Sequence, residues 1–273
     1  ELFYFSHVAD TSVKSTFNSY GEIPNSIEPS LLELKISVSE YAVRYFVLNN
    51  MHKQVVFYGE HILHHVSTSD ELAHRFEKTA DKDELLQLGY GNVVWGCNNA
   101  YEIFPAGFVV LPNDLLVMQR VGDAKILFNQ DEKVKSVMLK KFPSASISHL
   151  LSVWFQQTQN LQSKLLVNVG LTFFDLVFYD ETGNLKLATR YSYQTAKDFI
   201  YYVLLCCEDL NIDRTKTELI LAGEITQQSE IYSLCYRYFS HVNFFQPDSS
   251  IYFSKYFEEF PAHLHYNLYN LKA

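Results

Sequence analysis

The sequence has 273 residues and a formal net charge of −9, from 22 basic and 31 acidic side chains. Nucleic-acid binding needs a dense cationic surface that displaces counterions, so this balance argues against it, and equally against docking on an anionic membrane. Hydrophobic residues make up 48% and charged residues 19%, as in a globular chain, and no apolar run approaches the ~18 residues of a membrane span.

The first half of the chain predicts a β-meander followed by a helix and further strands. Residues 1–25 are polar and Ser-rich, and we expect an arm packed on the body. Because the sequence opens at Glu1 rather than Met, a removed leader stays open as an interpretation. Residues 32–63 alternate apolar and polar positions between turns, which predicts three strands, and Thr68 or Ser69 caps the helix that follows. The elements expected next are a helix at 68–88, a strand at 92–97, a hairpin at 101–112 and a strand at 124–129.

The second half repeats this plan. A Pro-Ser break predicts an N-terminal domain of residues 1–142 with a variant middle and a C-terminal domain of residues 143–273, opened by an amphipathic helix. Residues 165–194 repeat the meander, and Thr195 with Asp198 has the spacing of a capping box. The elements expected after the meander are a helix at 195–210, a strand at 218–223, a helix at 229–239 and a strand at 241–245. The order of elements is therefore β-β-β-α-β-α-β.

The two meanders can be superposed without a gap. Placing Leu34 on Val167 gives an offset of 133 residues, which also places Val43 on Leu176. The match rests on a hydrophobic period of two and on turns at matching places.

Two tandem units of this order resemble the actin-like ATPase superfamily, which comprises actin, Hsp70 and the sugar kinases. The resemblance covers about residues 31–245 and rests on architecture more than on motifs. Within the superfamily the second half is similar to the bacterial branch of the cell-division protein FtsA and the pilus-assembly protein PilM. A closer resemblance is to an uncharacterised bacterial family of actin-like-fold proteins. The implied fold is α/β, with two ribonuclease-H-like domains, each a mixed five-stranded sheet with helices, and a cleft between them.

In that superfamily an Asp-x-Gly turn follows the first strand of each half. The Gly lets backbone N–H groups approach phosphates, and the Asp holds Mg²⁺ or its waters. The second-half motif falls on Asn168-Val169-Gly170, where the Gly is kept and the carboxylate is replaced. At the offset of 133, the first-half motif falls on Lys35-Ile36-Ser37, which has neither the Asp nor the Gly.

A later Gly-Gly in the superfamily leaves room for adenosine. It falls on Ala222-Gly223-Glu224, where one Gly is Ala and the next residue is an acid that would oppose phosphate. The candidate vestigial nucleotide site therefore comprises Lys35, Ser37, Asn168, Gly170 and Gly223, and the resemblance implies a kept fold with lost ATPase chemistry.

The sequence thus favours a non-catalytic protein that binds an unidentified protein partner, without a catalytic residue, metal or cofactor. The alternative is an ATPase or small-molecule kinase with a divergent phosphate site, which would bind ATP and Mg²⁺ and in which Lys35 pairs with a phosphate. A third hypothesis is an enzyme of unrelated type that uses the interlobe cleft. A ribonuclease-H-type nuclease is disfavoured because its first-strand carboxylate would fall on Asn168 or Lys35.

Other polar groups admit simpler interpretations. Four Cys residues without paired spacing predict buried, reduced thiols of a cytoplasmic protein. We favour ordinary surface or half-buried histidines over a metal site at His61, His64 and His65, and no third ligand accompanies His263 and His265. Asp175 and Asp180 lie on or after the second strand of the second meander. Asp175 interrupts an apolar run, which leaves a functional role open, but such a residue more often lies on a solvated strand face or pairs locally. The aromatic tail, residues 252–271, is expected to pack against the second half, with a partner surface as the alternative.

Overall fold

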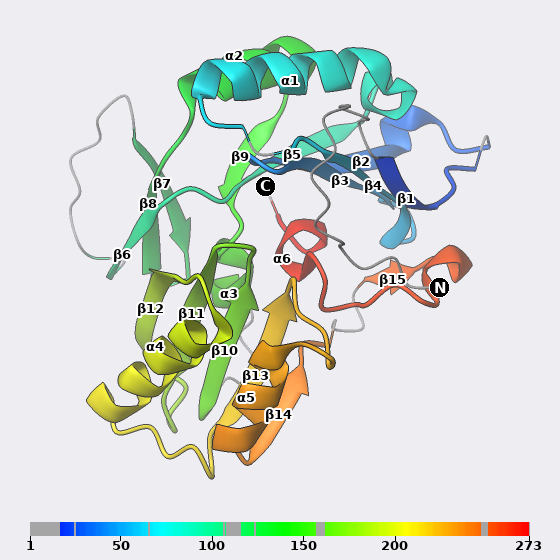
Figure 1. Ribbon diagram of the computed structural model, residues 1–273. Coiled ribbons are helices and arrows are strands. Elements are labelled where there is room, and N and C mark those ends of the chain that lie inside the picture. The colour runs from blue at the N-terminus through cyan, green and yellow to red at the C-terminus, as the bar shows by residue number, and fades with distance from the viewer. Residues whose placement is uncertain are drawn as a thin grey trace.

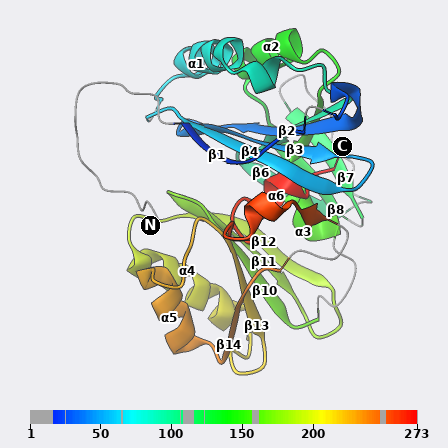
Figure 2. The ribbon, with the colours of Figure 1, turned by 90° about the vertical axis from the view of Figure 1, so that its right-hand side faces the viewer.

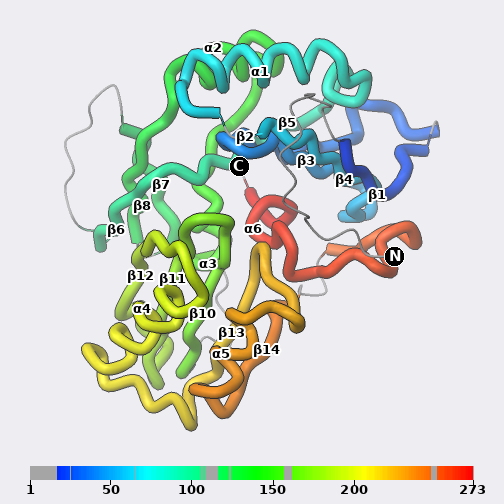
Figure 3. Tube along the Cα trace, in the orientation of Figure 1, coloured from blue at the N-terminus to red at the C-terminus, as the bar shows by residue number. Residues whose placement is uncertain are grey.

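The computed structural model describes residues 17–24, 26–64, 66–105, 107, 116–122, 124–156, 162–246 and 251–272. The chain forms two halves, each built on its own mixed β-sheet (Figure 1). Helices cover the outer face of each sheet, and the C-terminal segment passes between the two halves (Figures 1 and 3). Most of the predicted arm and His65 lie outside the described residues.

Among the residues that the structure describes, the first sheet has seven strands rather than the five expected. Its order is β1-β4-β3-β2-β5-β9, and β15 also pairs with β4. β2, β3 and β4 are the predicted antiparallel meander, whereas β5 and β9 run parallel to β2 and to β5 respectively. The strands are β1 (Phe17–Gly21), β2 (Leu32–Val38), β3 (Ala42–Asn49), β4 (Gln54–Ile62), β5 (Asn92–Cys97), β9 (Ser146–His149) and β15 (Tyr252–Phe253).

Two helices cover the outer face of this sheet, α1 (Ser69–Lys82) and α2 (Glu132–Lys141) (Figure 1). Thr68 caps α1 by accepting a hydrogen bond from Glu71 N, which satisfies one of the unpaired N–H groups of the first turn. A separate three-stranded sheet of order β6-β8-β7 is inserted between β5 and α2. Its strands are β6 (Tyr101–Pro105), β7 (Leu116–Val121) and β8 (Ala124–Asn129).

The second half follows the predicted order of elements. Its sheet, β12-β11-β10-β13-β14, has an antiparallel meander and two parallel strands, and α4 and α5 cover its outer face (Figure 2). The predicted capping box of Thr195 and Asp198 starts α4. The elements are β10 (Lys164–Val169), β11 (Phe173–Tyr179), β12 (Leu185–Ser192), α4 (Ala196–Asp209), β13 (Glu218–Gly223), α5 (Glu230–Tyr238) and β14 (His241–Phe244).

Two short helices lie between the sheets, α3 (Ser152–Gln156) and α6 (Tyr266–Tyr269) (Figure 2). Trp154 of α3 packs on Tyr266 of α6 with ring centroids 5.6 Å apart. One hydrophobic cluster joins the first sheet, both short helices and the inner face of the second sheet, including Leu166 and Ile220. A second cluster fills the space under α4 and α5. The two halves therefore share a core, and burial of apolar surface holds them together.

Three further features differ from the sequence predictions. The C-terminal domain was expected to begin at residue 143, but β9 pairs with β5 and so belongs to the first sheet. The predicted helix after the break begins only at Ser152, as α3, and residues 157–161 lie outside the described residues. The tail does not pack on the second half alone, because β15 adds to β4 of the first sheet through Tyr252 and Phe253.

Candidate functional site

The two candidate turns are aligned by the hydrogen bonds that close them. Ser39 N donates to Ala42 O at 2.9 Å, and Gly170 N donates to Phe173 O at 2.9 Å. Ser39 is therefore equivalent to Gly170, an offset of 131 residues, and the predicted offset of 133 is wrong by two. The cause is that a shift of two residues leaves every side chain on the same sheet face, so the hydrophobic pattern cannot detect it.

This alignment changes the first-half site. Ser37 is equivalent to Asn168, the position of the missing carboxylate, and Ser39 is equivalent to Gly170. Lys35 lies two residues earlier on β2 and is 4% exposed. Its Nζ donates to Tyr269 O of the C-terminal segment at 2.8 Å. Burial lowers the pKa of Lys35 to about 8, against the opposing effect of Glu33. Lys35 thus supports the C-terminal segment in this structure.

Two neighbours restrict Gly170 of the second turn, the hydroxyl of Tyr193 and the carbonyl of Phe173. Its carbonyl accepts a hydrogen bond from Tyr193 Oη at 2.5 Å. A Cβ at Gly170 would lie 3.0 Å from Phe173 O, so a larger residue requires the turn to shift. Burial and the nearby Glu224 raise the pKa of Tyr193 to about 12, so its hydroxyl stays a donor at neutral pH.

Gly223 at the end of β13 has a φ of +87°, the left-handed region that favours glycine. A Cβ there would lie 2.1 Å from Val169 O and 2.9 Å from Asn168 Oδ1. Its own N–H donates to His263 O at 2.9 Å, and Glu224 N donates to Val169 O at 2.7 Å. This glycine therefore allows close packing of the strand ends and the C-terminal segment, and its N–H already has a partner within the chain.

An arginine of β3 bridges the two halves beside these turns. Arg44 Nε lies 2.6 Å from Glu60 Oε1 of β4, and Arg44 Nη2 lies 3.0 Å from Glu224 Oε1 of the second half. Burial lowers the pKa of Arg44, but Glu224 and Glu60 outweigh this and hold it above its ordinary value. Burial raises the pKa of Glu224, and Arg44 opposes that rise. Asn18 Nδ2 completes the group with a 3.1 Å hydrogen bond to Glu60.

A second bridge lies on the other half. Arg190 of β12 binds Asp175 of β11 through two hydrogen bonds, Nε to Oδ1 at 2.7 Å and Nη2 to Oδ2 at 3.0 Å. The same guanidinium donates to the main-chain and side-chain oxygens of Asn98, both at 2.7 Å, and to Asn99 O at 3.2 Å. Its plane covers the ring of Phe173 at 4.0 Å. Asp175 is 2% exposed and pairs locally, which is one of the interpretations that its sequence allowed.

The two bridges are equivalent positions with inverted charges. Arg44 faces Glu60 across β3 and β4, whereas at the offset of 131 Asp175 faces Arg190 across β11 and β12. Their targets also correspond, since Asn98 and Glu224 each lie two residues beyond the strand position that pairs with Ser37 or Asn168. We call these six residues the interlobe clasp: Arg44, Glu60, Asn98, Asp175, Arg190 and Glu224.

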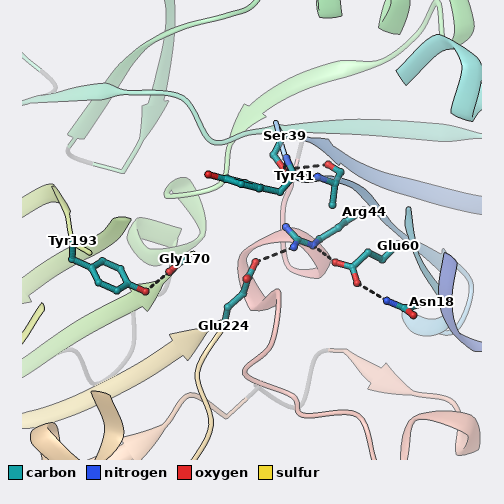
Figure 4. Close-up of polar contacts among 9 residues, drawn as sticks. Asn18, Ser39, Tyr41, Arg44, Glu60, Gly170, Tyr193 and Glu224 are labelled. Carbon is teal, nitrogen blue, oxygen red and sulfur yellow. Dashed lines mark hydrogen bonds and ion pairs between the residues drawn. The ribbon is translucent and has the colours of Figure 1, made fainter. Parts of the chain in front are cut away.

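The clasp places polar groups of the protein itself beside the two turns. Figure 4 shows Ser39 and Tyr41 on one side, Gly170 with Tyr193 on the other, and the bridge from Arg44 to Glu224 beside them. Three carboxylates and two guanidinium groups make up its charges. An excess of negative charge disfavours a phosphate, and the guanidinium groups already bind carboxylates.

The remaining predicted groups have local partners. His61 Nε2 lies 2.6 Å from Asp83 Oδ2, and Asp180 accepts hydrogen bonds within its own turn, including one from Thr182 N at 2.8 Å. Across the part of the chain that the structure describes, no group of three His, Cys, Asp or Glu side chains is placed to hold a metal ion. All four cysteines are buried and free, as predicted. No described helix is long and apolar enough to cross a membrane.

Comparison with known proteins identifies the fold that has this geometry. Residues 108–242 match the model of a family described as protein of unknown function (DUF3822). A solved structure from Bacteroides thetaiotaomicron, described as a protein with actin-like ATPase fold and unknown function, superposes with a TM-score of 0.65 and 16% identity, over 80% of this chain and 91% of that one. The chain has the actin-like ATPase fold.

A second match is the PilM-PilN type IV pilus biogenesis complex, with a TM-score of 0.52 and 9% identity, over 88% of this chain and 99% of that one. The predicted similarity to the actin-like superfamily and to PilM is thereby confirmed at the level of the fold. The family model agrees with the expected uncharacterised family. No curated protein sequence matches the chain.

Sequence reasoning missed most of the clasp. A signal was present, because Arg44 and Asp175 are single charged residues inside otherwise apolar strands. Such a residue needs a partner when it is buried. The partners, however, lie on other strands and, for Glu224 and Asn98, on the other half of the protein, which a period along one strand does not reveal.

Proposed function

We propose that the protein is a non-catalytic form of the actin-like ATPase fold that acts by binding another protein. The observation that carries this proposal is the clasp, in which Arg44 and Arg190 tie the two halves together where a nucleotide would bind between them. The metal-handling position is Ser37 in one turn and Asn168 in the other. Neither side chain carries a charge to counter a divalent cation.

Two further observations support the proposal. The N–H of Gly223, at the position expected beside adenosine, is bound by His263 O, and Lys35 is bound by Tyr269 O. A nucleotide beside Gly223 would have to displace the first of these contacts, and the second already engages the Lys35 ammonium group. The PilM-PilN complex also contains this fold in a protein that is bound to another protein.

The test is thermal unfolding of the whole chain with ATP, ADP or GTP and Mg²⁺. A ligand at 100 times its Kd stabilises the folded state by ~2.7 kcal/mol, which raises the Tm of a chain of this size by roughly 5 °C or more. We expect no saturable rise at millimolar nucleotide. A saturable rise would overturn the proposal.

If nucleotide does raise the Tm, two variants show whether it binds at the second turn. Gly170→Val places a side chain against Phe173 O. If the rise in Tm is lost in this variant, the nucleotide binds at the second turn. Gly89→Val is the matched control, because a Cβ at Gly89 has no atom within 4 Å. A rise lost in both variants would instead reflect general destabilisation.

A further inference from the structure

The C-terminal segment, residues 251–272, returns from the second half to the first and lies in a seat formed by both. β15 adds to the edge of β4, where Tyr252 N donates to Lys53 O and Ser254 N donates to Val55 O, both at 3.0 Å. The chain then enters the junction between the halves, where α6 lies against β2, β3 and β13 (Figures 2 and 3). Large side chains fill the seat; the buried ones are Phe257, Phe260, Tyr266, Leu268, Tyr269 and Leu271.

Two polar anchors of this segment inside the junction bind its main chain, and a third is the side chain of His263, whose Nε2 lies 2.8 Å from Ile225 O. Lys35 Nζ binds the carbonyl of Tyr269, and the N–H of Gly223 binds the carbonyl of His263. Any peptide offers such carbonyls, so these two anchors do not require this particular sequence. The aromatic side chains and the His263 ring therefore determine which segment fits the seat.

Buried polar atoms without a hydrogen-bond partner are concentrated in and around this segment. Five buried side-chain N or O atoms have no hydrogen-bond partner within the described residues. Three of them belong to the segment: Ser254 Oγ and both amide atoms of Asn267. A fourth is Nε1 of Trp154, whose ring packs on Tyr266 of the segment. Unpaired buried polar atoms oppose folding, because each loses its hydrogen bonds to water.

Two more features weaken the docked state. His265, just before α6, has a φ of 52°, a left-handed conformation that a non-glycine residue adopts at a cost. Its ring stacks on Tyr58 and lies near the guanidinium of Arg44 and the ring of His263. The segment thus combines strong aromatic contacts with unfavourable polar and backbone terms. Segments that release reversibly are drawn from such regions of low local stability.

We propose that residues 251–272 are a displaceable internal ligand, and that an aromatic-rich segment of a partner protein binds in the same seat. The inference rests on the proposed function and specifies its partner as an extended chain followed by a helical turn. The clasp does not involve this segment's side chains, so the two halves can stay together while the segment leaves. Replacement by a partner segment then restores the buried aromatic surface and the two carbonyl contacts.

The probe is a fluorescent synthetic peptide of residues 251–272, titrated into the whole chain and followed by anisotropy. Asn267→Leu in the protein removes two unpaired buried atoms, and we expect it to hold its own segment more tightly and to weaken peptide binding by about tenfold. The same change in the peptide should strengthen binding by a similar factor. Asn270→Leu is the matched control, because Asn270 Nδ2 already donates to Tyr266 O, and it should not weaken peptide binding.

Amide hydrogen exchange of the whole chain reports the release directly. The amide of Gly223, bonded to His263 O, should exchange together with residues 263–271 and faster than that of Leu221 on the same strand. Exchange of the segment only by global unfolding, or no saturable peptide binding, would overturn the inference. The proposed function is separable, because a saturable rise in Tm with Mg²⁺-ATP refutes that function whatever the peptide does.

Discussion

Removing the guanidinium of Arg190 tests whether the clasp stabilises the folded protein. Arg190→Met keeps a long side chain over Phe173 but leaves Asp175, 2% exposed, without its cation. Breaking a buried ion pair on one side costs about 3–5 kcal/mol, because the remaining charge is uncompensated. The variant also loses the contacts to Asn98 and Asn99 of the other half. We therefore expect a loss of about 4 kcal/mol in the free energy of unfolding, or roughly 10 °C in Tm.

Urea unfolding of four proteins measures this effect: the wild type, Arg190→Met, Asp175→Leu with Arg190→Met, and Lys140→Met. The double variant replaces the pair by apolar side chains, which is often neutral for stability, so it should be about 2 kcal/mol more stable than Arg190→Met. Lys140→Met is the control, since it removes an exposed ion pair with Glu77 and should cause no measurable loss. A loss below ~1 kcal/mol for Arg190→Met, or a double variant no more stable than the single one, would refute the reasoning.

Three further predictions follow from buried groups near the junction. Gly223→Ala should cost at least about 3 kcal/mol in urea unfolding, because its Cβ would lie 2.1 Å from Val169 O at a φ of +87°, whereas Gly89→Ala should be neutral. Burial lowers the pKa of His149 to about 4, below its value near 6.5 in the unfolded chain. The contribution of His149 to the free energy of unfolding is therefore full above pH 6.5 and falls by about 3 kcal/mol towards pH 4. Urea unfolding of His149→Gln at these pH values should not show this fall. Burial lowers the pKa of Lys35 to about 8, so the unfolded chain binds more protons and stability should rise by about 3 kcal/mol between pH 8 and 10.4; unfolding curves of Lys35→Met should not show this rise.

The fold was predictable because its elements carry local signals. The second half shows alternating strands, a capping box at Thr195 and an apolar helix face, and each signal points to the element that forms. The same signals recur in the first half, interrupted by the inserted three-stranded sheet. The repeat alignment failed by two residues because alternation is blind to such a shift, and the turn at Ser39 has no glycine to mark it.

The C-terminal segment was harder to predict because it has almost no regular structure. β15 has two residues and α6 has four, too few for a period of either two or 3.6 to emerge. Its position is fixed instead by contacts far apart in sequence, such as Lys35 with Tyr269. The same difficulty affected the candidate site: Lys35, which would pair with a phosphate under the alternative hypothesis, binds a carbonyl of the C-terminal segment.

The clasp uses equivalent positions in both halves, but the charges at these positions are inverted. Like charges therefore do not face each other across the junction. Each half places one ion pair at the same register of its second and third strands, Arg44 with Glu60 and Asp175 with Arg190. In both cases the arginine is the member that reaches across the junction, to Glu224 or to Asn98, because its guanidinium has donors left after binding one carboxylate. Motion between the halves would break both bridges at once, whereas release of residues 251–272 breaks neither. On the proposed function, we therefore expect a change in what occupies the junction rather than a hinge that opens and closes around a nucleotide.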